Sequence, residues 1–190
     1  MQIGAALLSG GQSRRMGRDK SRLLLDGQPF QTRIAAQLDG FPELLLSVGS
    51  TLREEPGFRP IPDIFPSCGP LGGLHALLAA CRSDALLIVS CDLPLFQREL
   101  GLFLAAQLTE AYSAVVPVTR DGRIHPLCGV YRKTLLPEIE SRLRAGNRRM
   151  VSLLEAVPTR YVPLEGTPFP DRWLTNVNTP QDLRRLLDQR

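Results

Sequence analysis

The sequence predicts an α/β fold, in which one doubly wound, mostly parallel sheet carries helices on both faces. Short apolar runs of strand length alternate with helical patterns along the 190 residues. The clearest run, at 85–90, reads Ala-Leu-Leu-Ile-Val-Ser, which is typical of a strand buried on both faces. No repeat or linker interrupts this alternation, so we expect a single domain over residues 1–190.

In the first half of the chain, glycine and proline mark where the elements begin and end. Ile3–Leu8 is an apolar run that stops at Ser9-Gly10-Gly11, as a buried strand entering a glycine loop does. Pro29 suits the first turn of a helix that reaches Leu38. The prolines of 59–62 favour a sheet edge or a loop. We expect strands at 3–8, 23–25, 43–48, 59–62 and 85–90, and helices at 29–38 and 70–81.

The same alternation continues in the second half. Thr179-Pro180 is an ordinary helix start, with Thr179 as N-cap and Pro180 at the first helical position. Doubly wound sheets bind ligands at the carboxyl ends of their strands, near a switch in strand order. The expected elements are strands at 114–118, 127–132 and 159–163, and helices at 98–108, 135–144, 150–156 and 180–188.

The charge pattern favours small phosphorylated ligands over nucleic acid. Lys and Arg number 23 against 19 Asp and Glu, and the basic residues form short groups rather than one basic element. The sequence contains no uninterrupted run of about 18 apolar residues, the length that a membrane-spanning helix needs. The beginning of the chain has no basic leader, so we expect a cytoplasmic protein that binds neither nucleic acid nor membrane.

The four cysteines do not form a metal or redox motif. Cys68, Cys81, Cys91 and Cys128 match neither zinc-site nor Cys-x-x-Cys spacing, and the chain has only two histidines. We expect all four to be buried, reduced thiols that pack as small hydrophobic side chains.

Residues 9–20, which read Ser-Gly-Gly-Gln-Ser-Arg-Arg-Met-Gly-Arg-Asp-Lys, are the densest functional signal. Glycines let main-chain N–H groups approach an anion, while Arg15 and Lys20 suit phosphate oxygens. The segment is neither a Walker A loop nor a dinucleotide fingerprint. The alternative is a tight surface turn with solvated arginines.

Asp92 follows the most apolar strand, where an unpartnered carboxylate is costly. Mg²⁺ on triphosphate oxygens is a natural partner, because Mg²⁺ prefers one or two carboxylates together with phosphates and water. The alternative is that Asp92 caps a following helix that begins near Pro94.

Asp63 is a candidate for base recognition. A carboxylate accepts two N–H donors side by side, as the edge of a nucleobase can present them. Main-chain groups of 69–73 are a second candidate for this role. The alternative is a turn-forming Asp among prolines.

These motifs together resemble those of the nucleotidyltransferases with a glycosyltransferase-A-like Rossmann fold, and most closely the molybdenum cofactor guanylyltransferases. That family transfers GMP from GTP to molybdopterin. The resemblance covers nearly the whole chain. The motifs that carry it are Leu8-Ser9-Gly10-Gly11, Arg15-Met16-Gly17-x-Asp19-Lys20, Asp63 with Gly69-Pro70-Leu71-Gly72-Gly73-Leu74, Cys91-Asp92-Leu93-Pro94, His125-Pro126-Leu127, Gly146-Asn147-Arg148-Arg149 and Asn176-Val177-Asn178-Thr179-Pro180.

The resemblance implies a set of roles for residues of this chain. Arg15, Lys20 and Asp92 would be catalytic, with Mg²⁺ on Asp92. Nucleotide binding would fall to Leu8, Ser9, Gly10, Gly11, Lys20, Ser47, Asp63, Gly72 and Asp92. Ser47 departs from the family, which often has Asn at this position, and the serine hydroxyl has a shorter reach than the asparagine amide.

The acceptor side would comprise Arg148, Arg149, Asn176 and Asn178. The arginines precede an expected helix, where cations oppose the helix dipole, so an anionic ligand would explain them. A solvated face is the alternative for Arg148 and Arg149. The two asparagines would bond the amide edge of the pterin.

The expected reaction partners are GTP and molybdopterin that carries molybdenum, with transfer of the product to apo-molybdoenzymes. Two other functions stay open. One is a related nucleotidyltransferase that uses CTP on molybdopterin, or a nucleotide on another phosphorylated small molecule. The other is a non-catalytic nucleotide carrier, against which Asp92 and Lys20 argue, because a carrier needs no metal carboxylate.

Overall fold

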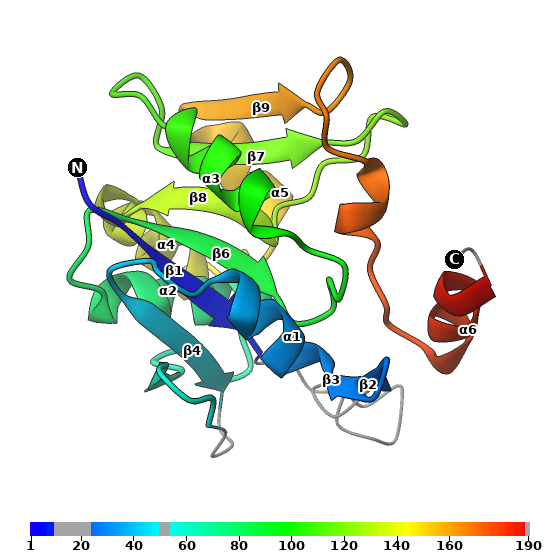
Figure 1. Cartoon of the computed structure of the whole chain (residues 1–190). Coiled ribbons are helices and arrows are strands. Elements are labelled where there is room, and N and C mark those ends of the chain that lie inside the picture. The colour runs from blue at the N-terminus through cyan, green and yellow to red at the C-terminus, as the bar shows by residue number, and fades with distance from the viewer. Residues whose placement is uncertain (10–23, 50–53, 189–190) are drawn as a thin grey trace.

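The computed structural model, which describes residues 1–9, 24–49 and 54–188, is built around a seven-stranded sheet (Figure 1). The strand order is β5-β4-β1-β6-β8-β7-β9. The bounds are β1 (Ile3–Leu8), β4 (Leu44–Gly49), β5 (Arg59–Pro62), β6 (Ala85–Ser90), β7 (Ala114–Val118), β8 (Cys128–Arg132) and β9 (Thr159–Pro163).

The sheet is mostly parallel, which confirms the predicted fold class. β1 pairs in parallel with β4 and β6, β4 with β5, and β7 with β9. β8 is antiparallel to both of its neighbours, β6 and β7. The proline-rich β5 forms one edge, where missing N–H donors cost no ladder hydrogen bonds on the open side.

Helices cover both faces of the sheet because alternate strand residues point to opposite faces. Ala6 and Leu8 belong to the core beneath α2 (Gly69–Ala80), α4 (Leu136–Arg144) and α5 (Met150–Ala156). Ala5 and Leu7 belong to the opposite core, beneath α1 (Phe30–Gln37) and α3 (Arg98–Ala106). The helix expected at 98–108 ends two residues earlier than predicted, at Ala106. Beyond it, the Leu108 N–H donates a hydrogen bond to the Ala105 carbonyl in a tighter turn.

The last helix, α6 (Pro180–Asp188), lies beyond the sheet beside the short strands β2 (Leu24–Leu25) and β3 (Gln28–Pro29) (Figure 1). Leu186 packs there with Leu25 and Phe30. Thr179 is its N-cap, as predicted: the Asp182 N–H donates to Thr179 Oγ1 over 3.1 Å, and the Thr179 N–H donates to Asp182 Oδ2 over 2.8 Å. Two 3-10 turns, η2 (Lys133–Leu135) and η3 (Asp171–Leu174), complete the elements of the described chain.

The strand order reverses between β1 and β6. From β1 the chain passes through α1 to β4 on one side, whereas β6 lies on the other side. A hydrogen bond of 3.1 Å from the Cys91 N–H to the Leu8 carbonyl joins the ends of these two strands. The predicted nucleotide loop and Asp92 therefore flank the switch point, where doubly wound sheets bind their ligands.

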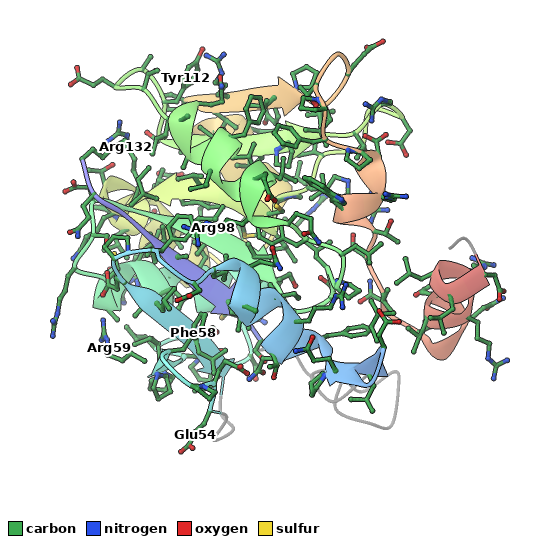
Figure 2. The ribbon with its side chains drawn as sticks, viewed as in Figure 1. Glu54, Phe58, Arg59, Arg98, Tyr112 and Arg132 are labelled. Carbon is green, nitrogen blue, oxygen red and sulfur yellow. The ribbon has the colours of Figure 1, made fainter. Side chains whose placement is uncertain are left out.

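At the end of the sheet opposite the switch point, basic residues are engaged in structural hydrogen bonds. Arg59 and Arg132 lie there (Figure 2). Arg59 Nη2 donates to Glu43 Oε1 over 3.0 Å, and Arg132 Nε donates to the Tyr112 carbonyl over 2.8 Å. In the described parts of the chain, no helix is long and apolar enough to cross a membrane. The cysteines are free thiols, and all but the half-buried Cys91 are buried.

Candidate functional site

Three buried polar atoms at the carboxyl edge of the sheet have no hydrogen-bond partner among the described residues. They are Ser47 Oγ near the end of β4, Asp63 Oδ1 after β5 and Asp92 Oδ1 after β6. Buried polar atoms are nearly always hydrogen-bonded, and leaving one unmet costs about 1–3 kcal/mol. Because all three atoms lie at the carboxyl ends of the strands, we infer that a polar ligand binds there and supplies the missing hydrogen bonds.

A fourth unpartnered atom, His75 Nδ1, lies elsewhere. His75 is on α2, where its ring meets the edge of Phe65 at a centroid distance of 4.9 Å. Burial lowers the pKa of His75, so the neutral ring is favoured at this position. This histidine belongs to the packing of α2 rather than to the carboxyl edge.

Asp92 is not a helix cap. The next helix, α3, begins at Arg98 with Gln97 as its N-cap, so the alternative of a cap near Pro94 is wrong. The residues between them form turns, in which the Leu93 N–H donates to the Ser90 carbonyl over 3.2 Å. Asp92 therefore keeps a carboxylate oxygen for a ligand.

The start of α2 packs directly against the ends of β1 and β4. A Cβ atom on Gly73 would lie 2.7 Å from Leu8 Cδ1 and 3.0 Å from Ser47 Oγ. A Cβ atom on Gly72 would lie 2.9 Å from the Cβ of Cys68. Gly73 therefore allows α2 to approach Leu8 and Ser47, both predicted to bind the nucleotide, whereas Gly72 allows the segment before α2 to lie close to the helix.

Asp63 lies between β5 and α2. Its N–H donates to the Gly49 carbonyl over 3.2 Å, which holds the residue beside the end of β4. Burial raises the pKa of the Asp63 carboxyl, because no donor compensates for the lost water. Gly69, at the first position of α2, has a φ of +64°, a conformation that favours glycine.

A buried polar chain connects Ser9 to α1 and to the segment before β5. Ser9 Oγ donates to Gln31 Oε1 over 3.0 Å, and Gln31 Nε2 donates to Glu55 Oε2 over 3.0 Å. Gln31 and Glu55 are 7% and 8% exposed, so this chain is a built part of the interior. Gln31 was not predicted as a site residue, because a glutamine in a helix gives no sequence signal of burial. Of the predicted loop residues, Gly10, Gly11, Arg15 and Lys20 lie outside the described residues.

The segment with the two predicted asparagines lies beside Asp92. The Val177 N–H donates to the Asp92 carbonyl over 2.8 Å, which places Asn176 and Asn178 on either side of that contact. Asn176 Oδ1 accepts a hydrogen bond of 3.3 Å from Arg123 Nη2. The Asn178 N–H donates to Asp182 Oδ2, which fixes this segment to the start of α6.

Arg148 and Arg149 lie on the other flank. Arg148 Nη1 donates to the Ser67 carbonyl over 3.0 Å, so Arg148 is beside the loop between Asp63 and α2. The Arg149 N–H donates to Asn147 Oδ1, which starts the seven-residue α5. The structure therefore brings Arg148 to the Asp63 loop, whereas the asparagines gather at Asp92.

The donor set at Asp92 fits a metal that is shared with a nucleotide. No group of three or more His, Cys, Asp or Glu side chains in the described residues could hold a metal ion by itself. Asp92 offers one carboxylate with an unpartnered oxygen. Mg²⁺ uses such a site, because it takes one or two carboxylates and completes its shell with phosphates and water.

Comparison with known sequences gives consistent matches along the chain. Residues 5–161 match the family model of the MobA-like NTP transferase domain. A probable molybdenum cofactor guanylyltransferase of Carboxydothermus hydrogenoformans is 34% identical, over 96% of this chain and 93% of that protein. The molybdenum cofactor guanylyltransferase of Vibrio cholerae is also 34% identical, over 93% of this chain and 87% of that protein.

Solved structures share the fold. The molybdopterin-guanine dinucleotide biosynthesis protein A of Archaeoglobus fulgidus superposes with a TM-score of 0.79 at 22% identity, covering 100% of this chain and 98% of that one. The 2-C-methyl-D-erythritol 4-phosphate cytidylyltransferase of Thermus thermophilus gives a TM-score of 0.68 at 19% identity, covering 100% of this chain and 98% of that one. At these identities the likeness establishes the architecture alone.

Proposed function

Because this chain belongs to the MobA-like NTP transferase family, we propose that it transfers GMP from GTP to the phosphate of molybdopterin. The protein is a nucleotidyltransferase, and its similarity to molybdenum cofactor guanylyltransferases extends over nearly its whole length. The observation that carries the proposal is the set of three unpartnered buried atoms at one edge of the sheet, on Ser47, Asp63 and Asp92. We take residues 1–190 to act as one domain.

The reaction is an in-line displacement at phosphorus. An oxygen of the molybdopterin phosphate forms a bond to the α-phosphorus of GTP, while the bond from that phosphorus to the bridging oxygen breaks. Pyrophosphate leaves with the electron pair. The attacking phosphate is already ionised near neutral pH, so no general base is needed, and positioning with charge neutralisation supplies the rate.

We assign the nucleotide to the β5-β4-β1 side of the switch point. Leu8, Ser9, Ser47 and Gly72 would line it, and Asp63 would accept the two N–H groups of the guanine edge. Residues 10–23 connect Ser9 to β2, and we propose that Gly10, Gly11, Arg15 and Lys20 bind the triphosphate. The raised pKa of Asp63 supports this role, because two guanine donors would meet a carboxylate that lacks any.

Asp92 would hold Mg²⁺ at the triphosphate. When bound, Mg²⁺ neutralises charge on the phosphate oxygens. The chain itself positions this carboxylate: the end of β6 carries it, and the contact with Val177 braces its main chain.

We assign the acceptor to the region of Asn176 and Asn178, whose amides suit the amide edge of a pterin. The hydrogen bond of Val177 to Asp92 supports this assignment, because it holds the segment beside the residue to which we assign the metal. Arg148 and Arg149 remain candidates for acceptor binding. Through its contact with Ser67, Arg148 lies on the side of the site that we assign to the nucleotide, so titration with both ligands decides between the two roles.

The decisive experiment measures pyrophosphate release with each of the four nucleoside triphosphates, with and without molybdopterin, in the presence of Mg²⁺. We expect release only with GTP and only with the acceptor, together with formation of the guanine dinucleotide. Equal turnover of CTP would assign a cytidylyltransferase. Tight GTP binding without acceptor-dependent release would assign a nucleotide carrier.

A further inference from the structure

The turn between β7 and β8 contains Arg120 and Arg123, and hydrogen bonds within the turn fix its main chain. The Thr119 N–H donates to the Arg123 carbonyl over 3.0 Å, and the Gly122 N–H donates to the Thr119 carbonyl over 2.8 Å. Asp121 Oδ1 accepts from Thr119 Oγ1 over 2.6 Å and from the Arg123 N–H over 3.2 Å. These bonds fix where the side chains of Arg120 and Arg123 begin.

The two arginines of this turn differ in their partners. Arg120 is used structurally, because its Nη1 lies 2.7 Å from Asp171 Oδ1 and its N–H donates to Asp171 Oδ2. Arg123 has no carboxylate partner among the ion pairs of the described residues. Its guanidinium donates to a neutral group, Asn176 Oδ1, over 3.3 Å. Most N–H donors of this cation are therefore available to a ligand.

Arg123 stands on the Asp92 side of the switch point. Asn176, its partner, immediately precedes Val177, whose N–H is bonded to the Asp92 carbonyl. β8 also begins at this place, since Cys128 is paired with Val89 near the end of β6. Arg123 thus reaches the region of the two asparagines from a direction opposite to Asp63 and Ser47.

His125 lies next to this turn. It is 7% exposed, and its Nε2 is 3.4 Å from Thr119 Oγ1. Burial lowers the pKa of His125, and the nearby charge of Arg123 lowers it further, while the carboxylates of Asp121, Asp171 and Asp92 act in the opposite direction. The buried ring of His125 therefore lies among the charges of this turn, of Asp171 and of Asp92, on the Asp92 side of the switch point.

Taking the proposed function as its basis, we propose that Arg123 binds the phosphate of the acceptor and holds it beside Asp92. A phosphate is the ligand that this cation best fits, because a guanidinium binds phosphate oxygens through two parallel hydrogen bonds. Asn176 orients the guanidinium and would itself contact the pterin. Arg123 is thus a substrate-binding residue on the acceptor side, separate from the cations at 15 and 20 that we assign to the triphosphate.

The test compares Arg123→Ala with Arg123→Lys and with the matched control Arg120→Ala from the same turn. The KM for molybdopterin is measured by pyrophosphate release, and GTP affinity is measured by titration without acceptor. We expect Arg123→Ala to raise the KM for molybdopterin at least about tenfold. GTP affinity should stay within about twofold, and Arg123→Lys should lie between alanine and wild type because it keeps the charge without the fork. Arg120→Ala should leave both quantities near wild type.

Each other outcome overturns the inference. Wild-type KM for molybdopterin in Arg123→Ala would show a solvated arginine, and an equal loss for GTP would move Arg123 to the triphosphate. An equal loss in Arg120→Ala would show that the turn is merely disturbed. If the wild-type protein releases no pyrophosphate with GTP and molybdopterin, the proposed function itself fails. Retained GTP affinity certifies that a variant is folded.

Discussion

The main-chain N–H of Val177 donates a hydrogen bond of 2.8 Å to the carbonyl oxygen of Asp92. This contact joins the loop after β6 to the segment before α6. Val177 is also buried with Leu25, Phe30 and Leu186, so the same segment is anchored on the structure around α1. The position of Asp92 therefore depends on residues 176–178, which we propose to bind the acceptor.

Asp92→Asn should abolish most turnover without harming the fold. The amide keeps the shape of the side chain but removes the charge that would hold Mg²⁺. Losing an electrostatic interaction of this kind lowers the rate by a factor of about 10²–10³. Stability should be unchanged or slightly higher, because a buried carboxylate oxygen of Asp92 has no partner among the described residues. The measurements are Mg²⁺-dependent pyrophosphate release and thermal unfolding. Asp84→Asn is the control, because Asp84 directly precedes β6, at the end of that strand opposite to Asp92. An Asp92→Asn variant with the wild-type rate would refute the metal assignment.

Asp63→Asn should weaken GTP binding and reduce the preference for GTP over CTP. Losing the hydrogen bonds between one edge of the base and the carboxylate costs about 1–3 kcal/mol in binding free energy. Titration with both nucleotides provides the measurement. If the two affinities change in parallel, Asp63 does not recognise the base.

The difference in stability between Asp63→Asn and the wild-type protein should change with pH in favour of the variant as the pH rises. Burial raises the pKa of Asp63 above its ordinary value of 3.8, so its contribution to stability is fully present below about that pH. The contribution is lost as the pH rises through the raised pKa. We therefore expect the Asn variant to gain in thermal midpoint over wild type from pH 4 to pH 7. A constant difference across this range would contradict the burial of an unpartnered carboxyl.

Ser47→Ala separates a ligand contact from a packing role. Ser47 is fully buried, and its hydroxyl has no partner in the described structure. Removing the hydroxyl should leave the free protein equally or more stable, because an unmet buried polar group is lost. GTP affinity should fall by about 0.5–1.5 kcal/mol, the net value of one hydrogen bond. Unchanged GTP affinity would leave Ser47 without a nucleotide role.

Gly73→Ala should reduce both stability and GTP affinity. Its Cβ would meet Leu8 and Ser47 at 2.7 and 3.0 Å, and such overpacking costs about 1–3 kcal/mol in unfolding free energy. Gly101→Ala on α3 is the matched control, because its Cβ would lie 2.7 Å from Leu87 Cδ2, in the core on the opposite face. We expect the control to lose stability but to keep its GTP affinity. Equal GTP affinities in the two variants would show that the close approach of α2 serves packing alone.

Arg149→Ala should weaken molybdopterin binding while GTP affinity stays nearly unchanged, with the stability of α5 unchanged or slightly improved. Parallel titrations of both ligands on this variant and on Arg148→Ala provide the measurement. Since Arg148 is bonded to Ser67 near the nucleotide side, its variant is the internal comparison. Equal loss of both ligands in Arg149→Ala would place Arg149 at the nucleotide, and no loss would leave it a solvated residue.

Much of the fold was predictable because local patterns determine it. The apolar run at 85–90 is buried at every position, and the proline-rich 59–62 lies at the sheet edge. Thr179 caps α6 as its spacing predicts. In each case the deciding interactions lie within a few residues along the chain, so the sequence carries the signal directly.

The candidate site was predictable only in part. Asp92 follows from a carboxylate placed after an apolar strand, and the structure leaves its oxygen unpartnered. Gln31 and Arg123 gave no signal, because their importance comes from partners 22 and 53 residues away. An amphipathic helix and an exposed turn are the ordinary settings for such residues.

By itself, the sequence determined the alternation of strands and helices, and with it the residues at the ends of strands. Only the tertiary structure decided the order of those strands and the antiparallel direction of β8. That order brings Asp63, Ser47 and Asp92 to one edge, and it brings Arg123 to Asn176 beside Asp92. The physical reason is that side-chain periodicity specifies which face of an element is buried, whereas the choice of neighbour depends on long-range packing of the whole core.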